Sequence, residues 1–508
     1  MLTLVNYLPK SFNNKDQNIN NLQSKNMKKN ISKSLFLCLL FVSFTISAQQ
    51  IKRHNVLFIL TDDQRFNTIQ SLNNKEIQTP NIDKLVKSGT TFTQAHIMGS
   101  LGGAVCAPSR AMLLTGRSVF QVHQDGGYIP ASEKTFPEVF RDNGYTTFST
   151  GKWHSDYLSF NRSFSSGDNI FFGGMHVEKE GGHWKPRINH YDMSAQYKNS
   201  FAGNKFSSIY YADAAIDFLK QHHATPFLMY VAFTAPHDPR TPPAEYLSLY
   251  NKKEIMIPGN FLPKHPFNNG ELNVRDEQLL GTPRDPDSVK MEIAKYYAMI
   301  TEVDHEIGRI LDALKKTGQY ENTIIVFAAD NGLAVGQHGL LGKQNLYDHS
   351  MRVPLIFSGP GIPANKKTDA YCYLTDVFAT LCKMNKLPIP NTVNGNSLND
   401  TFTQRKFQGR SHLFMTYSNL QRAIVKDNMK LILYNVDGNH PIQLFDLAKD
   451  PLEKNNLANK KSRQTLIKSL RNLLYNEMRS YGDFCDLKKE NWGYSGRLEF
   501  KDALRINP

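Results

Sequence analysis

Charged and polar side chains gather at four places in this sequence, each directly after a run of apolar residues. The four clusters supply these candidates for binding or catalysis: Asp62, Asp63, Lys152, His154, His237, Asp330 and Asn331. Carboxylate and amide oxygens are hard ligands that suit Ca²⁺ or Mg²⁺, with Ca²⁺ favoured where the ligands are many. Adjacent carboxylates repel each other unless a cation lies between them. Lysine and histidine beside such a metal suit an anionic substrate, such as a phosphate or sulfate ester.

The apolar runs before these clusters have the composition of strands that are buried on both faces of a sheet. They cover residues 55–60, 146–150, 226–233 and 323–329. Between the last two runs, residues 291–316 carry apolar side chains at helical spacing, and Gly318 ends that pattern. Ligands of an open α/β sheet bind outside the carboxyl ends of its parallel strands. We therefore expect parallel strands that bring the four clusters into one crevice, although each cluster alone also suits an ordinary turn.

Cys106 is the candidate nucleophile because of its position relative to a predicted helix. Residues 104–117 read AVCAPSRAMLLTGR. Pro108 suits the first turn of a helix and Gly116 its end, which places Cys106 at the positive N-terminal end of that helix. A lone cysteine is more often a small buried apolar residue, so the neighbouring residues decide between the two interpretations.

The residues around Cys106 resemble the signature of the type I sulfatases, which are members of the alkaline-phosphatase superfamily. That signature is C-x-P-S-R, found here at 106–110 and followed by LTGR at 114–117. Further matching segments, in family order, are TDDQR at 61–65, GKWH at 151–154, APHD at 235–238, DNG at 330–332 and GLLGK at 339–343. The resemblance covers about residues 52–480 and implies an α/β fold with a large mixed, mostly parallel sheet flanked by helices. The segment FFGGM at 171–175 is similar to polysaccharide sulfatases of Bacteroidetes.

The same resemblance implies a modified nucleophile and a bound metal ion. A formylglycine-generating maturation enzyme would oxidise Cys106 to formylglycine (3-oxoalanine), and one hydroxyl of its hydrate would attack sulfur. One Ca²⁺ would be held by the modified Cys106 together with Asp62, Asp63, Asp330 and Asn331. The metal would lower the pKa of the hydroxyl and neutralise negative charge on the sulfate.

Five further residues take roles from the family pattern. Arg110 would orient the formylglycine and add positive charge. Lys152 and Lys343 would hold sulfate oxygens. His154 would take the proton of the second hydroxyl, which expels sulfate, and His237 would protonate the departing sugar oxygen.

Two segments rich in Gly, Pro and Asn, residues 155–205 and 238–288, are expected to select the substrate. Each sugar-binding candidate within them is at least as well suited to structural packing, and the candidates are His176, His183, Trp184, Arg187, His190 and Arg240. His338 suits loop packing and a site role equally. We expect the substrate to be a sulfated polysaccharide or its oligosaccharides, with ulvan, carrageenan or a similar algal glycan favoured over a host glycan.

The start of the chain predicts export. Residues 27–48 combine a Lys-rich beginning, a short apolar run and the small residue Ala48, as in a cleaved signal peptide. The apolar run is shorter than the ~20 residues that a spanning helix needs. We therefore expect a leader at 1–48, with Met27 as a suitable true start, and a periplasmic or secreted protein without stable membrane insertion.

Length and composition limit the remaining organisation. The 508 residues are 40% apolar and 21% charged, which predicts globular domains. We expect a catalytic domain at 49–389 and a smaller domain at 390–508 with an antiparallel sheet and one helix. Five cysteines are too few for a disulfide-dense scaffold, and three of them are expected to be unpaired: Cys372, Cys382 and Cys485.

The net charge of +14 predicts an affinity for polyanions. Charge alone does not distinguish nucleic acid, anionic lipid and acidic glycan, but the motifs favour a sulfated glycan and no nucleic acid. Two alternative functions remain from the sequence. One is a phosphoesterase or phosphonate hydrolase on the same scaffold, and the other is a noncatalytic glycan-binding protein. The oligomeric state is not predicted.

Overall fold

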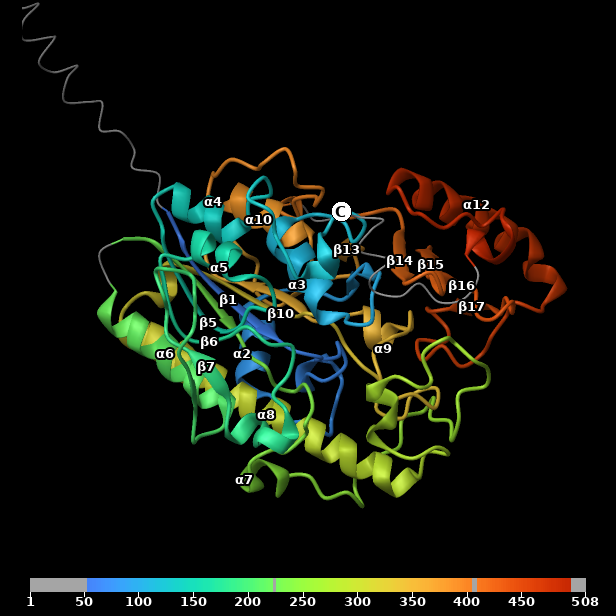
Figure 1. The fold of residues 1–508 in the computed structure, drawn as a ribbon, viewed down its shortest axis with the longest axis horizontal. Helices are drawn as coiled ribbons and strands as arrows, with labels where there is room; N and C mark the ends of the chain where they lie inside the picture. Colours follow the sequence, from blue (N-terminus) through green and yellow to red (C-terminus); the bar gives the residue numbers. More distant parts are fainter. Residues whose placement is uncertain (1–52, 223–224, 404–408, 495–508) are drawn as a thin grey trace, which may run out of the picture. The chain divides into compact units, whose positions relative to one another are not determined.

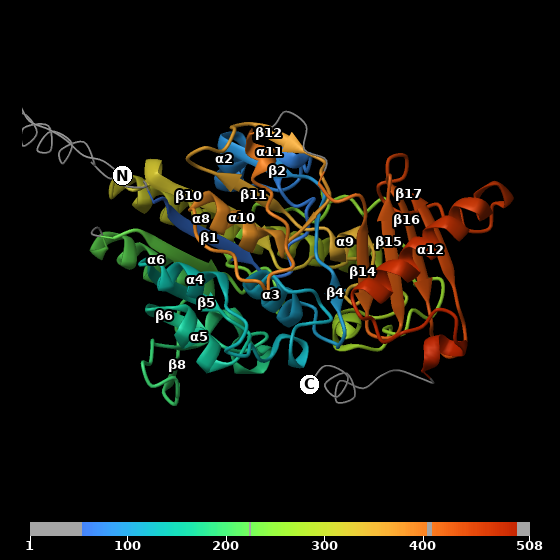
Figure 2. The same cartoon turned by 90° about the horizontal axis from the view of Figure 1, so that it is seen from above.

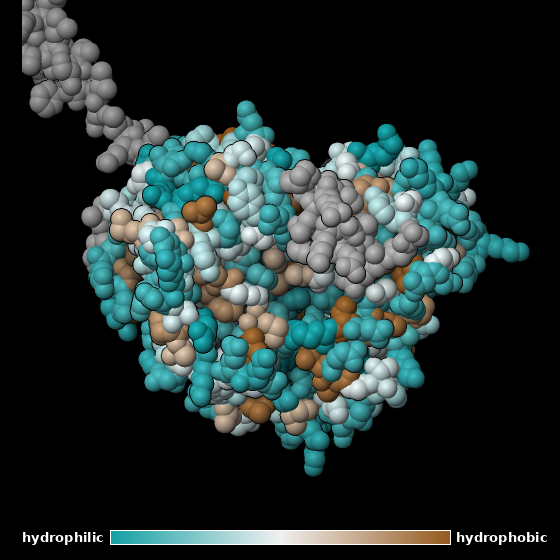
Figure 3. All heavy atoms as spheres, in the orientation of Figure 1, coloured by the Kyte–Doolittle hydropathy of each residue, from teal (hydrophilic) through white to brown (hydrophobic). Residues whose placement is uncertain are grey.

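The computed structural model describes residues 53–222, 225–403 and 409–494. The predicted leader at 1–48, with Met27 and Ala48, lies outside these residues. Within the described part, no helix is both long and apolar enough to cross a membrane. The face drawn in Figure 3 is mostly hydrophilic and carries separate small hydrophobic patches.

A ten-stranded mixed sheet forms the centre of the fold, in the order β12-β2-β11-β10-β1-β9-β5-β6-β7-β8. Its middle consists of four adjacent parallel strands: β10 (Thr323–Ala329), β1 (Asn55–Thr61), β9 (Phe227–Ala232) and β5 (Thr146–Lys152). The flanking strands are β12 (Lys366–Thr368), β2 (Gly89–Phe92), β11 (Leu355–Ser358), β6 (Ser166–Phe171), β7 (Arg187–Asn189) and β8 (Ser200–Ala202). The predicted α/β class with a mixed, mostly parallel sheet is confirmed, and the four predicted strands lie side by side.

Helices cover both faces of this sheet because its strands are apolar on both faces (Figure 1). In β1, Val56 and Phe58 belong to one apolar cluster, and Leu57 and Ile59 belong to the other. The first cluster includes side chains of α3 (Cys106–Thr115), α4 (Phe136–Asp142), α5 (Tyr157–Ser163) and α10 (Asp376–Met384). The second includes side chains of α2 (Pro80–Ser88), α6 (Ser207–Gln221) and α8 (Pro286–Lys316), the last of which contains the predicted helix at 291–316.

A five-stranded sheet follows in the C-terminal part of the chain. Its antiparallel strands are β14 (Leu413–Tyr417), β15 (Gln421–Lys426), β16 (Met429–Tyr434) and β17 (Ile442–Asp446), and α12 (Gln464–Ser480) packs against them. The fifth strand is β4 (Gly99–Ser100), which pairs parallel with β14 and comes from a distant part of the sequence (Figure 2). The sequence predicted an antiparallel sheet with one helix, but it predicted neither β14 nor the addition of β4.

Short elements complete the described fold. β3 (Ala95–His96) and β13 (Cys372–Tyr373) form a two-stranded parallel sheet, and α7 (Ala244–Leu247), α9 (Asp348–Met351) and α11 (Asp400–Thr403) are single helical turns. Cys372, Cys382 and Cys485 are buried free thiols, as expected from their odd number.

Phe58 in β1 provides a test of how far the central sheet depends on its aromatic packing. Its ring lies 5.5 Å from that of Tyr230 and 5.6 Å from that of Phe136, measured between centroids, and it is fully buried. We expect Phe58→Ala to lower the free energy of unfolding by about 3–5 kcal/mol, because it leaves a cavity between sheet and helices. Urea unfolding would measure this, with Tyr128→Ala as the control because Tyr128 is 40% exposed. Equal urea midpoints for the two variants would contradict the expectation.

Candidate active site

Four predicted metal ligands meet at the carboxyl ends of two neighbouring strands. Asp62 and Asp63 follow β1, and Asp330 and Asn331 follow β10, whose last residue pairs with Thr61. The backbone N–H of Asp63 donates to Asp330 Oδ1 at 3.1 Å, and Asn331 Nδ2 donates to Asp63 Oδ1 at 2.6 Å. All four side chains are buried. Parallel pairing therefore brings together residues that are more than 260 positions apart in the chain.

The backbone at Asp63 has a conformation that other residues must hold in place. Asp63 has φ 64°, a left-handed conformation that is uncommon for a residue other than glycine. The hydroxyl of Tyr296 in α8 donates to the Asp63 carbonyl at 2.6 Å and accepts from the Arg65 N–H at 3.0 Å. Tyr296 was not predicted from the sequence, because in the apolar pattern of α8 a tyrosine looks like an ordinary core residue.

The donor set fits a hard divalent cation. Asp62 Oδ1 and Asn331 Oδ1 are buried oxygens without a hydrogen-bond partner. Ligand atoms of Asp62, Cys106 and Asp330 lie within 4.8 Å of one another, and so do those of Asp62, Asp63 and His237. Burial, and then the charge of Asp62, raise the pKa of the Asp330 carboxyl above its ordinary value. A cation among these oxygens would offset the unfavourable burial and mutual repulsion of the carboxylates. Oxygen ligands favour Ca²⁺ over a thiophilic metal.

Three cationic side chains balance the three carboxylates of the site. Lys152 Nζ lies 2.6 Å from Asp62 Oδ2, and Lys343 Nζ lies 2.7 Å from Asp63 Oδ1. Arg110 Nε donates to Asp330 Oδ2 at 2.8 Å. Burial would raise the pKa of Asp62, but the charge of Lys152, together with those of Arg110 and Lys343, lowers it, and the pKa lies below its ordinary value. With a divalent cation added, the pocket becomes positive and attracts an anion.

The end of β5 positions Lys152 through a glycine. Gly151 has φ 90°, and a Cβ on it would lie 1.9 Å from the carbonyl oxygen of Ala232 in β9. Only glycine allows this close approach, after which Lys152 Nζ reaches both Asp62 and the Gly174 carbonyl oxygen, the latter at 2.5 Å. In the Gly-Lys pair at 151–152, Gly151 therefore allows the backbone conformation and Lys152 supplies the positive charge.

Cys106 is the first residue of α3, as predicted, and its thiol lies beside His154. Sγ is 3.5 Å from His154 Nδ1. Burial raises the pKa of the Cys106 thiol, so the unmodified side chain stays protonated and is a weak nucleophile. Burial, and then the positive charge of Lys152, lower the pKa of His154 well below its ordinary value. The site therefore pairs Cys106 with a neutral imidazole that can accept a proton.

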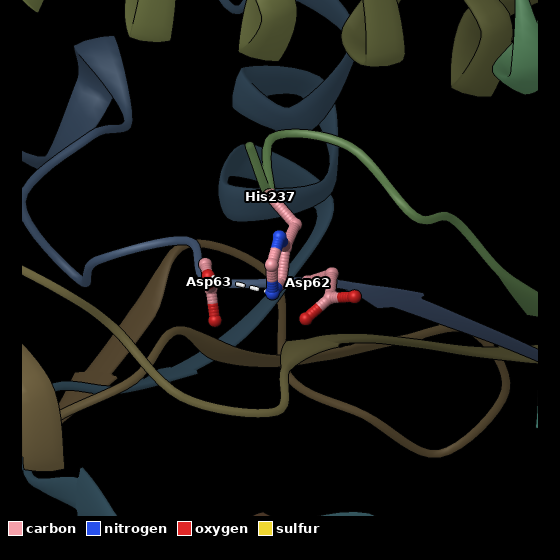
Figure 4. Close-up of side chains that lie close together, drawn as sticks. All are labelled: Asp62, Asp63 and His237. Carbon is pink, nitrogen blue, oxygen red and sulfur yellow. Dashed lines mark ion pairs between the residues drawn. The ribbon is translucent and has the colours of Figure 1, made fainter. Parts of the chain in front are cut away.

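His237 contacts the same acidic pair, and in the view of Figure 4 its ring lies between the side chains of Asp62 and Asp63. Its Nε2 is 3.6 Å from Asp63 Oδ2, while its Nδ1 donates to the Asp238 carbonyl oxygen at 2.9 Å. His183 Nε2 donates to the His237 carbonyl oxygen at 2.9 Å and is itself buried. The carbonyl contact at Nδ1 leaves Nε2 as the atom of His237 that faces the site.

Of the loop residues that the sequence suggested for sugar binding, some are buried in structural contacts and others are exposed. His183 supports the backbone of His237, and the buried Arg240 is paired with Glu292 at 3.1 Å. Trp184 is 43% exposed and remains able to contact a ligand. The ring of His338 stacks on that of Tyr347 with centroids 4.0 Å apart, which is a packing role.

The site is a buried cluster of carboxylates, lysines and histidines around a cysteine at a helix terminus. Such a cluster is typical of a hydrolase of anionic esters. Comparison with known proteins identifies the class of hydrolase. Residues 54–384 match the family described as Sulfatase, and residues 336–480 match the family described as N-sulphoglucosamine sulphohydrolase, C-terminal. The chain belongs to the sulfatase family, and it is a sulfuric ester hydrolase of the alkaline-phosphatase superfamily.

Three similar proteins illustrate the range of this family. A sulfatase of Formosa agariphila is 27% identical over 84% of this chain and 87% of its own length. An ulvan-active sulfatase of the same organism is 27% identical over 84% of this chain and 82% of its own length. A structure solved in complex with its substrate D-glucosamine-2-N,6-O-disulfate has a TM-score of 0.71 at 23% identity, covering 87% of this chain and all of the other. The last similarity concerns the fold alone.

We expect Ca²⁺ to stabilise the protein through these oxygens. At a hundredfold excess over its Kd, a ligand adds about 2.7 kcal/mol to the free energy of unfolding. Thermal unfolding after chelation should therefore show a midpoint that Ca²⁺ raises more than Zn²⁺ does. Asp330→Asn should reduce the Ca²⁺ effect, whereas the surface variant Asp142→Asn should keep it. An undiminished rise in Asp330→Asn would show that Ca²⁺ binds elsewhere.

Proposed function

We propose that this sulfatase hydrolyses sulfate esters of a sulfated glycan or its oligosaccharides, using a formylglycine made from Cys106. The observation that carries the proposal is the position of Cys106 at the start of α3. It lies beside a neutral His154 and within one cluster with Asp62 and Asp330. An unmodified, protonated thiol would be a poor nucleophile in this setting, which favours conversion of Cys106 by a maturation enzyme.

When present, Ca²⁺ would supply positive charge opposite the sulfate group, and the formylglycine would supply an attacking hydroxyl. The metal would be held by Asp62, Asp63, Asp330, Asn331 and the modified Cys106. Arg110 is held between Asp330 and the Lys152 carbonyl oxygen at 2.9 Å, so it adds fixed positive charge beside residue 106. Lys152 and Lys343 are the remaining cations for sulfate oxygens.

The two histidines suit opposite proton transfers. His154 is next to Cys106 and neutral, so it can accept a proton from residue 106. His237 presents Nε2 to the site, and a proton on that atom would serve the departing sugar oxygen. His154 contacts residue 106 and His237 contacts Asp63, so the two imidazoles face different groups of the site.

An acidic sugar is favoured as the substrate by the surface next to the sulfate pocket. A cavity of about 280 Å³ is lined by the rings of Tyr157, Phe172 and Tyr197 and by the cationic residues Lys185 and Arg187. It also includes Gly173, which adjoins the residue whose carbonyl accepts from Lys152. Aromatic rings stack on sugar faces, and lysine and arginine pair with sulfate or carboxylate groups.

The similarity to an ulvan-active sulfatase supports an algal glycan. Six Lys and one Asp lie in the first fifty residues, so +9 of the net charge of +14 belongs to the rest of the chain and suits a polyanionic polymer. The signal-peptide pattern at 27–48 supports export to the periplasm or the medium, where such polymers occur. We therefore favour ulvan, carrageenan or a similar algal glycan as the source of the substrate.

The modification of Cys106 gives the direct test of the proposal. Peptide masses of the mature protein should show the Cys106 peptide about 18 Da lighter, as expected when a thiol is replaced by an aldehyde. Cys106→Ala should keep the thermal midpoint within a few degrees and lose all measurable sulfate release from algal oligosaccharides. Sulfate release by Cys106→Ala at the wild-type rate would overturn the proposed nucleophile.

The loss of activity in His237→Ala should depend on the leaving group of the substrate. A sugar alkoxide is a poor leaving group, so His237→Ala should lower kcat/KM on a sugar sulfate by about 10²–10⁴-fold. Nitrophenyl sulfate releases a stable phenolate, so the same variant should lose far less on it. Arg110→Ala is the matched comparison and should damage both reactions, because its charge acts on the sulfate group common to both.

Both His237 and Arg110 variants need measured metal content and formylglycine occupancy before their rates are compared. An equal loss on both substrates for His237→Ala would assign His237 to sulfate binding. The proton donor would then have to be sought elsewhere in the site.

A further inference from the structure

A second cavity, of about 350 Å³, lies outside the catalytic crevice. Most of its lining comes from residues within 65–67, 256–260, 348–352 and 451–453, and Glu76, Ile293, Tyr297 and Gln337 complete it. None of the ten residues assigned above to metal binding or catalysis lines it. It is therefore a separate cavity, although Arg65 connects it through Tyr296 to the backbone of Asp63.

Arg65 lines this cavity as a buried cation without an anionic partner. Its side chain is only 3% exposed, and its Nε and Nη1 have no hydrogen-bond partner. The guanidinium lies over the ring of Tyr296, 5.2 Å from its centroid, and no carboxylate of the described residues forms an ion pair with it. Arg352 in the same cavity, by contrast, donates to the Thr93 carbonyl oxygen at 2.6 Å. A buried charge without a partner costs free energy, so Arg65 favours a bound anion.

Two further groups offer hydrogen bonds to the same space. Both ring nitrogens of His349 are shielded from solvent and have no partner. Burial, and then the charges of His338 and Arg65, lower the pKa of His349 well below its ordinary value, so the ring offers one donor and one acceptor. Asn260 donates through Nδ2 to the Leu452 carbonyl oxygen at 2.9 Å, which leaves its buried Oδ1 as an unpartnered acceptor.

The acidic residues of the cavity do not cancel Arg65. Asp348 and Glu453 are both paired with Lys430 Nζ, at 2.9 and 2.8 Å. Glu76 accepts from the Met256 N–H at 2.8 Å. None of these carboxylates forms an ion pair with Arg65 within the described residues, and their oxygens add acceptors for hydroxyl groups.

Apolar side chains form the rest of the wall. Phe66, Ile293 and Tyr297 lie within the cavity lining, and Met256 and Leu452 are exposed at 72% and 41%. An occupant that satisfies the whole lining has one acid group, several hydroxyl groups and an apolar face. Sugars carrying an acid group combine these three features.

We propose that this cavity is a binding site for an acidic sugar unit, with Arg65 pairing its acid group and Asn260 and His349 bonding its hydroxyls. The site is separate from the catalytic crevice and requires no turnover. Binding can therefore be tested independently of whether the proposed sulfatase substrate is correct.

Isothermal titration of the mature, Ca²⁺-loaded protein with methyl β-glucuronoside tests the site, because this probe carries an acid group and no sulfate ester. The neutral methyl β-glucoside and inorganic sulfate are the companion probes. We expect the glucuronoside to bind more tightly than either. Arg65→Gln should weaken it by about 10- to 100-fold, as for the loss of a hydrogen bond to a charged group.

Leu452→Trp supplies a second variant that fills the cavity from an exposed position, so the test does not depend on the folding of Arg65→Gln. It should also weaken glucuronoside binding, whereas Ile389→Trp, also at a position 41% exposed but outside the cavity, should not. Thermal midpoints report whether each variant is folded. Unchanged binding in both cavity variants, no binding by wild type, or equal binding of the neutral glucoside or of sulfate would each overturn the proposal.

Discussion

The structure depends on holding three carboxylates and three cationic side chains together in a site that is buried from solvent. Asp62, Asp63 and Asp330 are buried within a few ångströms of one another, and each has a contact with Arg110 or a lysine. Removing one partner from such a cluster leaves a buried charge uncompensated, which is strongly unfavourable. The cluster therefore has to be supported on all sides by elements that cannot move apart.

That support comes from the central parallel strands. β10, β1, β9 and β5 end at the same edge of the sheet, so each delivers its polar residues without a long connecting loop. The positive φ values of Asp63 and His154, 64° and 66°, show local conformations that are costly by themselves. The sheet and the Tyr296 hydroxyl maintain the conformation of Asp63. His154 lies two residues after the end of β5.

The two-sheet organisation has consequences for stability as well as for the site. β4 lies a few residues before Cys106 in the sequence and pairs with β14. The segment that leads to the nucleophile is therefore hydrogen-bonded to the C-terminal sheet. The ring of Phe120 also stacks on that of Phe414, with centroids 6.0 Å apart. The predicted boundary near residue 390 therefore separates segments of sequence that share one apolar cluster.

The sequence by itself determined the four central strands, the helical segments at 109–115 and 291–316, and the types of residue in the candidate site. It could do so because apolar runs and the polar residues that end them are local features. Only the tertiary structure showed that Tyr296 holds Asp63, that His183 supports His237 and that β4 joins the distant sheet. The cavity around Arg65 was likewise not predictable from the sequence, because its lining residues are spread along the chain from Arg65 to Glu453. Such contacts arise from packing between distant residues, and no local pattern encodes which partners will meet.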